Sequence, residues 1–361
     1  MYSKTYNPKK YWMGLNIIMV ASMVIIGGIT RITNSGLSMT EWNLIGGIIP
    51  PLNLQDWNLL FDKYKATPEY EFKNFDITLS EFKFIFFWEY FHRVWGRLIG
   101  FTFIIPLIYF WIAKKLSFVE KKFFIILIGI GSFQAFMGWF MVESGLTDQP
   151  DVSHFRLSAH LTTAFIIYIM LVFSFWNYLS KNTAFERSVR NSQLKGHSNR
   201  IIFSIIILIL TIASGAFVSG TNAGWAYNNF PLMGENFLPP IISEANELTL
   251  HLAFNDIGFI QFFHRILATL TLLIILYTVY KAINDSVFIK LRKYFYFLGV
   301  FVILQNVLGV IILKLFVPTL LGLFHQFGSL IVLTNLVIIY AETKNRGAER
   351  GGIRGIPYGK N

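Results

Sequence analysis

Long apolar runs separated by short polar segments divide this 361-residue chain. A helix that crosses a lipid bilayer needs about 20 mainly apolar residues. Eight runs approach or exceed that length, and they lie at 12–32, 83–112, 123–142, 156–178, 201–220, 258–280, 294–314 and 319–340. The pattern predicts an all-α integral membrane protein with eight transmembrane helices, because a helix satisfies its own backbone hydrogen bonds in lipid. Tyr11 leads directly into the first run, so we expect no cleavable signal or transit peptide.

The composition supports this class, since 54% of the residues are hydrophobic and only 14% are charged. Most of the 31 Lys and Arg residues fall at the two ends of the chain and in alternate loops, whereas 221–257 holds four acidic residues and no Lys or Arg. This distribution predicts that both termini are cytoplasmic. The basic tail 342–361 would then face water or lipid headgroups, so despite a net charge of +11 we expect no nucleic-acid partner.

An internal repeat relates the two halves of the chain. The segment Gly-Gly-Ile-Thr-Arg-Ile-Thr-Asn-Ser-Gly (27–36) resembles Gly-Ala-Phe-Val-Ser-Gly-Thr-Asn-Ala-Gly (215–224), and each continues through a Trp to a Pro-Pro pair. Four helices per repeat is an even number, so both halves enter the membrane in the same direction. We therefore predict two parallel-repeat four-helix bundles. The expected parts are an N-terminal half (1–180), a cytoplasmic linker (181–200), a C-terminal half (201–341) and the basic tail (342–361).

Four histidines inside the apolar runs form two matching pairs, His92 with His160 and His264 with His325. An ionisable side chain in hydrocarbon costs a few kcal/mol, so it indicates function. All four lie near the outer end of their runs, and the members of a pair can therefore face each other across a flat macrocycle. The chain has no cysteine. The pattern favours bis-histidine heme ligation over a copper or zinc site, which would need more clustered ligands.

The remaining histidines lie in predicted loops, and we expect them not to be ligands: His154, His197 and His251.

The two halves differ beside the first histidine of each pair, where Glu-Tyr-Phe-His-Arg (89–93) is echoed by Gln-Phe-Phe-His-Arg (261–265). Glu89 lies one helical turn from His92 and can shuttle protons or stabilise positive charge on a substrate, whereas a glutamine cannot do acid–base work. The pattern favours chemistry in the first half and electron supply in the second. A structural ion pair of Glu89 with Arg93 or Arg97 is the alternative. Arg93 and Arg265 could bind heme propionates or simply reach toward the interface.

At this point the chain resembles a heme A synthase. The resemblance runs from Gly27 to about Leu333, and its most specific strings are Gly-Gly-Ile-Thr-Arg-Ile-Thr-Asn-Ser-Gly-Leu-Ser-Met-Thr-Glu-Trp (27–42), Glu-Tyr-Phe-His-Arg-Val-Trp-Gly-Arg-Leu-Ile-Gly (89–100), Phe-His-Arg (263–265) and Leu-Phe-His-Gln (323–326). It implies oxidation of the C8 methyl group of heme O to a formyl group, through successive hydroxylations and loss of water, to give heme A for terminal oxidases. Some bacterial members carry paired cysteines in their outer loops, so this chain resembles the cysteine-free branch.

The resemblance also implies roles for the residues singled out above. His264 and His325 would bind the iron of a resident heme b cofactor, His92 and His160 would hold the iron of the substrate heme O, and Glu89 would be the catalytic carboxylate. The expected setting is a bacterial cytoplasmic membrane, where lipid, an electron donor that no motif identifies and a heme O synthase would be partners.

Two other functions are weighed beside the enzyme. A diheme b-type membrane electron carrier would place its hemes near opposite membrane faces, and it has no use for Glu89. A heme or small-molecule transporter would show polar breaks near the bilayer midplane, whereas the functional groups of this chain gather toward the outer side.

Overall fold

The computed structural model describes residues 8–41, 47–145, 152–180, 191–243 and 249–348. Its long helices are α1 (Pro8–Ile32), α4 (Leu79–Ile112), α5 (Phe118–Gly145), α6 (His154–Ser180), α7 (Asn191–Gly220), α10 (Ile257–Ile283), α11 (Arg292–Lys314) and α12 (Thr319–Ala348). The short ones are α2 (Leu54–Lys65), α3 (Pro68–Phe72), α8 (Pro240–Ser243), α9 (Leu250–Ala253) and the 3₁₀ turns η1 (Ala223–Trp225) and η2 (Ser286–Leu291).

The prediction of eight membrane-spanning helices is confirmed within the described residues, where eight helices are long and apolar enough to cross a bilayer. Most of them begin earlier than their apolar runs, because a helix also includes a polar first turn that caps its free backbone N–H groups. At the start of α4 the side chain of Thr78 accepts from the Glu81 N–H, and that of Glu81 accepts from the Thr78 N–H. At the start of α10 the side chain of Asp256 accepts from Phe259 N.

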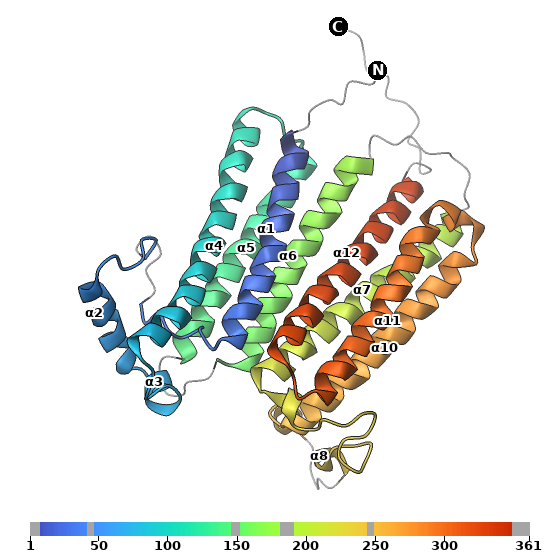
Figure 1. Cartoon of the computed structure of the whole chain (residues 1–361). Helices are drawn as coiled ribbons and strands as arrows, with labels where there is room; N and C mark the ends of the chain where they lie inside the picture. The colour runs from blue at the N-terminus through green and yellow to red at the C-terminus, as the bar shows by residue number, and fades with distance from the viewer. Residues whose placement is uncertain (1–7, 42–46, 146–151, 181–190, 244–248, 349–361) are drawn as a thin grey trace.

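The long helices form two groups of four, and Figure 1 shows them side by side. In the first group α1 packs against α4 and α6, and α5 packs against α6. In the second group α7, α10, α11 and α12 each pack against the next, and α12 returns to α7. The groups meet where α6 contacts α7 and α12, and where α1 contacts α12. One apolar core runs through both groups, from Trp12 of α1 to Ile339 of α12.

Three of the short helices, α2, α3 and α8, lie beyond the same ends of the long helices (Figure 1). We call this the cap end. In the first half the cap has its own small core, in which Phe61 and Tyr64 of α2 pack against Phe82 at the start of α4. Burial, with the neighbouring Glu69 carboxylate, raises the pKa of the Tyr64 hydroxyl well above its usual value. The hydroxyl therefore stays protonated and donates to Glu69 at 3.1 Å.

The loop assignment of the three remaining histidines was wrong. His154 is the first residue of α6, His197 lies within α7 and His251 lies in α9. For His154 and His197 the reason is again that the helix extends beyond its apolar run, whereas His251 lies in a separate four-residue helix outside the eight runs. His197 Nε2 lies 2.9 Å from Asp285 Oδ2, and its Nδ1 lies 2.8 Å from an Nη atom of Arg200.

The expected linker and tail lie only partly in the described structure. Residues 191–200 form the first turns of α7, and α12 continues to Ala348. The rest of the expected linker, 181–190, and of the basic tail, 349–361, lies outside the described residues.

Candidate functional site

The structure brings the four intramembrane histidines together in the expected pairs. His160, His264 and His325 lie within the first eight residues of α6, α10 and α12, near the cap end. His92 lies deeper along α4, because that helix starts with extra turns in the cap. His92 interacts electrostatically with His160, and His264 with His325. Each half of the molecule thus carries one histidine pair contributed by two different helices.

Every one of these imidazoles rests against a glycine of a neighbouring helix. A Cβ atom at Gly27 of α1 would lie 3.1 Å from His92 Cε1, and one at Gly138 of α5 would lie 3.2 Å from His160 Cε1. The second half repeats the arrangement, with Gly215 against His264 at 3.2 Å and Gly309 against His325 at 3.1 Å. A side chain at these positions would push the ring away, so the glycines set how far each imidazole stands from its neighbouring helix.

The orientation of the His264 ring is set by a serine on α7. Ser214 donates its hydroxyl proton to Thr211 O at 2.7 Å, so its Oγ is an acceptor for His264 Nδ1 at 2.8 Å. The proton of the neutral imidazole therefore lies on Nδ1, and the lone pair of Nε2 is left for a ligand. This is the arrangement that a heme iron requires of its axial histidine.

The other three histidines are held less directly. In the first half Thr30 Oγ1 lies 3.4 Å from His92 Nδ1 while it donates to Ile26 O at 3.0 Å. The Gln134 side-chain amide lies 3.2 Å from His160 Nε2, and His160 Nδ1 has no hydrogen-bond partner within the described residues.

In the second half the Gln305 amide contacts His325, with its nitrogen 3.2 Å from Nδ1 and 2.7 Å from the backbone oxygen. In the second pair both rings therefore have a polar neighbour at Nδ1, but Ser214 Oγ accepts from His264 there whereas the Gln305 amide nitrogen donates to His325. In the first pair only His92 has an Nδ1 contact, and that contact is long.

Each half thus offers two imidazoles set beside glycines, which is a donor set suited to a heme iron. His92 and His264 leave the Nε2 lone pair to a ligand, whereas the amide nitrogens of Gln134 and Gln305 face His160 Nε2 and His325 Nδ1.

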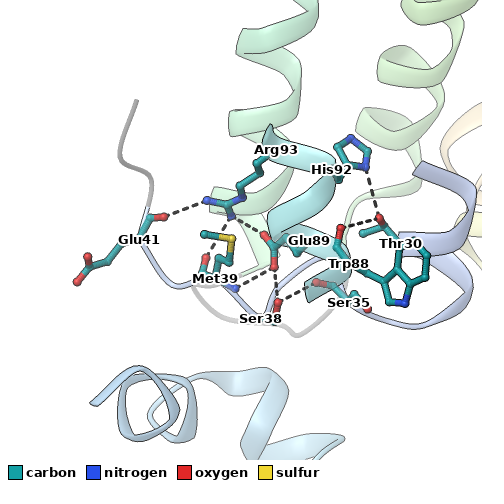
Figure 2. Close-up of polar contacts among 9 residues, drawn as sticks. All are labelled: Thr30, Ser35, Ser38, Met39, Glu41, Trp88, Glu89, His92 and Arg93. Atoms are coloured by element: carbon teal, nitrogen blue, oxygen red, sulfur yellow. Dashed lines mark hydrogen bonds and ion pairs between the residues drawn. The ribbon is translucent and has the colours of Figure 1, made fainter. Parts of the chain in front are cut away.

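Glu89 lies buried, with 3% of its surface exposed, beneath the segment that follows α1 (Figure 2). Its Oε2 accepts from Ser38 Oγ at 2.7 Å and from Met39 N at 2.8 Å, and its Oε1 forms an ion pair with Arg93. The ion pair that the sequence left as an alternative is therefore present. Because all these partners are donors, they hold both carboxylate oxygens in place one helical turn from His92.

Arg93 and Arg265 have matching environments in the two halves. Arg93 donates to Met39 O at 3.2 Å and to Glu41 O at 3.0 Å (Figure 2). Arg265 donates to Leu232 O at 3.0 Å and Tyr227 O at 2.8 Å, and it also reaches Gln261 Oε1 at 3.2 Å. Both arginines thus join a cap segment to the helix that carries the first histidine of the pair.

Comparison with known proteins places the chain in a family. Residues 10–337 match COX15-CtaA, described as cytochrome oxidase assembly protein. The chain belongs to this family. A relative named heme A synthase from Flavobacterium psychrophilum is 42% identical over 326 residues, which are 89% of this chain and 94% of the relative. A heme A synthase from Rickettsia prowazekii is 39% identical over 342 residues, which are 92% and 97% of the two chains.

Several residues of the site were not found from the sequence. Gly138 and Gly309 follow Gln134 and Gln305 by four residues in Gln-Ala-Phe-Met-Gly and Gln-Asn-Val-Leu-Gly, a repeated spacing that could have pointed to them. Ser214 has no such signal, because the hydroxyl that contacts the corresponding histidine in the first half, that of Thr30, lies at a different place in the repeat.

Proposed function

We propose that this protein is a heme A synthase, an oxidoreductase that converts the C8 methyl group of heme O into a formyl group. The observation that carries the proposal is the identity of 42% over 89% of the chain with a relative of that name. Two histidine pairs in equivalent positions support it, because the reaction needs a site for the substrate and a second site for a redox cofactor.

The first half is proposed to bind the substrate. His92 and His160 would hold the iron of heme O, with their rings placed by Gly27 and Gly138. The hydroxyl contact with His92 is long, 3.4 Å against 2.8 Å for His264, and His160 Nδ1 has no hydrogen-bond partner within the described residues. Such contacts suit a molecule that enters, reacts and leaves better than a permanent cofactor.

Glu89 is proposed as the catalytic carboxylate. Successive hydroxylations convert the methyl group to a geminal diol, which loses water to leave the formyl group. In that last step one diol hydroxyl gives up its proton and the other gains a proton and leaves as water, and an oxygen of Glu89 is the group we assign to accept the first proton and return it to the departing hydroxyl. Ser38 and Met39 orient the carboxylate, and Arg93 stabilises its charge until the proton arrives. Gln261, in the second half, cannot accept a proton in this way.

The second half is proposed to hold heme b between His264 and His325. When bound there, the heme supplies a redox centre that takes up and passes on single electrons. Ser214 keeps the His264 proton on Nδ1, so that Nε2 remains available to the iron. Gln305 and Gly309 position the His325 ring from the neighbouring α11.

The chain is a multi-pass membrane protein, and we propose the bacterial cytoplasmic membrane as its location. A heme O synthase is a proposed partner, since its product is too apolar to cross water freely. An electron donor is also required.

The experiment that tests the function uses a host that makes heme O but not heme A. With the gene expressed, hemes are extracted from the membranes and identified by chromatography and mass. We expect the formylated heme to appear. If the protein accumulates with heme b bound and only heme O and heme b are recovered, the proposal is overturned in favour of a diheme electron carrier.

A further inference from the structure

Arg156 occupies a special position relative to the first histidine pair. It precedes His160 by four residues on α6, so both side chains leave the same face of the helix. One helical turn, about 5.4 Å, separates them along the axis. Since α6 starts at the cap end, Arg156 lies between His160 and that end.

The guanidinium of Arg156 is held in place by α5. One Nη atom donates to Phe140 O at 2.8 Å, and the guanidinium carbon lies 3.6 Å from the centre of the Phe140 ring. In the described part of the chain Arg156 forms no ion pair. The carbonyl and the ring use one donor and one face of the group, so further N–H donors remain for another acceptor.

The equivalent position in the second half is apolar. Leu321 precedes His325 by four residues on α12, as Arg156 precedes His160. A cation, Arg156, therefore precedes the second histidine only in the half that we assign to the substrate.

We propose that Arg156 binds a propionate carboxylate of the substrate heme. This inference rests on the proposed function and names the group that recognises the substrate. Heme O carries its charged propionates on one edge of the macrocycle, and that edge would point toward the cap end, where the path to water is shortest. A planar guanidinium there offers two parallel N–H donors to a carboxylate.

The test compares heme O with its dimethyl ester, in which both propionates are uncharged. Each is titrated into the purified full-length protein carrying its resident heme, and Kd is measured by difference absorption. We expect the wild type to bind the diacid about 10- to 100-fold more tightly than the diester, the range of a charge-assisted hydrogen bond. Arg156→Leu should lose this preference while binding the diester as before, and Arg156→Lys should retain part of it.

Leu321→Ala is the matched control, and it should keep the full preference. Resident heme content shows that each variant is folded. The inference is overturned if Arg156→Leu keeps the wild-type preference, or if it weakens both ligands equally, as a purely structural link from α6 to α5 would. Asp148 and Asp151 lie outside the described residues. If Arg156 pairs with either of them instead of a propionate, Arg156→Leu will likewise leave the preference for the diacid unchanged.

The two proposals fail differently. If the wild type forms no heme A from heme O, the proposed function fails. If it forms heme A but does not distinguish the diacid from the diester, the role of Arg156 fails and the function stands.

Discussion

The two halves of this protein share a plan but differ in how tightly it is built. In the second half the backbones of α10 and α11 approach closely and the four helices close a ring, whereas the backbones of α4 and α5 stand farther apart and the ring of Phe103 packs on that of Phe124 between them. The second half anchors His264 through Ser214 at 2.8 Å, and the first has only the 3.4 Å contact from Thr30 to His92. A closed, anchored bundle suits a resident group, and a looser one suits a substrate.

The side chain beside the first histidine of each pair also differs between the halves. A carboxylate, Glu89, lies beside the first pair and an amide, Gln261, beside the second, although both contact the arginine four residues later. A single atom type, oxygen in place of nitrogen, thus separates a group that can accept a proton from one that cannot. The roles that we propose for the two halves would specialise a repeated scaffold without a change of fold.

Removing one histidine from each half is the strongest way to break this comparison. His264→Ala should lose the resident heme completely, because one of its two axial ligands is gone. His92→Ala should keep that heme and lose conversion of heme O. Heme content per protein is measured from the pyridine hemochrome spectrum. Equal loss of heme b in both variants would show that the halves are not specialised as we describe.

The second largest effect is expected from replacing the carboxylate of Glu89. Glu89→Gln should lower the rate of heme A formation by about 100-fold or more, the usual contribution of acid–base catalysis, with resident heme unchanged. Glu41→Gln, at an exposed carboxylate that pairs with Lys63, is the control and should leave the rate within about twofold of the wild type. Normal turnover by Glu89→Gln would remove the catalytic assignment, and only its structural contacts with Ser38 and Arg93 would remain.

The glycines offer a matched pair on one helix. Gly138→Ala places a Cβ atom 3.2 Å from His160, whereas a Cβ atom at Gly129 of the same helix meets nothing within 4 Å. Displacing the ring should lower turnover by about 10- to 100-fold, as small misplacements at reacting centres do. Gly129→Ala should have no effect. Equal rates for the two variants would mean that the His160 ring moves freely.

The smallest effect separates the two hydroxyls that face the histidines. Ser214→Ala should weaken heme b binding by about tenfold, the lower limit for losing a partner of a metal-bound histidine. Thr30→Ala should weaken heme O binding by no more than about twofold, because its contact is long. Both are measured as Kd by heme titration. A larger loss of heme affinity for Thr30→Ala than for Ser214→Ala would contradict our inference that His264 is held more firmly than His92.

The sequence by itself determined the spans, the pairing of the histidines and the contrast between Glu89 and Gln261. Apolar length is a property of the chain alone, and the duplicated motif places His92 and His264 at equivalent positions whatever the packing. Neighbours three or four residues apart on a helix are also fixed by its period, which is why the pairing of Glu89 with Arg93 could be named in advance.

Only the tertiary structure decided which residues of other helices reach the histidines. The contacts of Gly138 with His160 and Ser214 with His264, and of Ser38 with Glu89, depend on how each helix is rotated and where it crosses its neighbour. Side-chain packing sets those quantities over the whole bundle, and no local pattern encodes them. The same is true of the wider backbone separation of α4 and α5, which has no counterpart between α10 and α11.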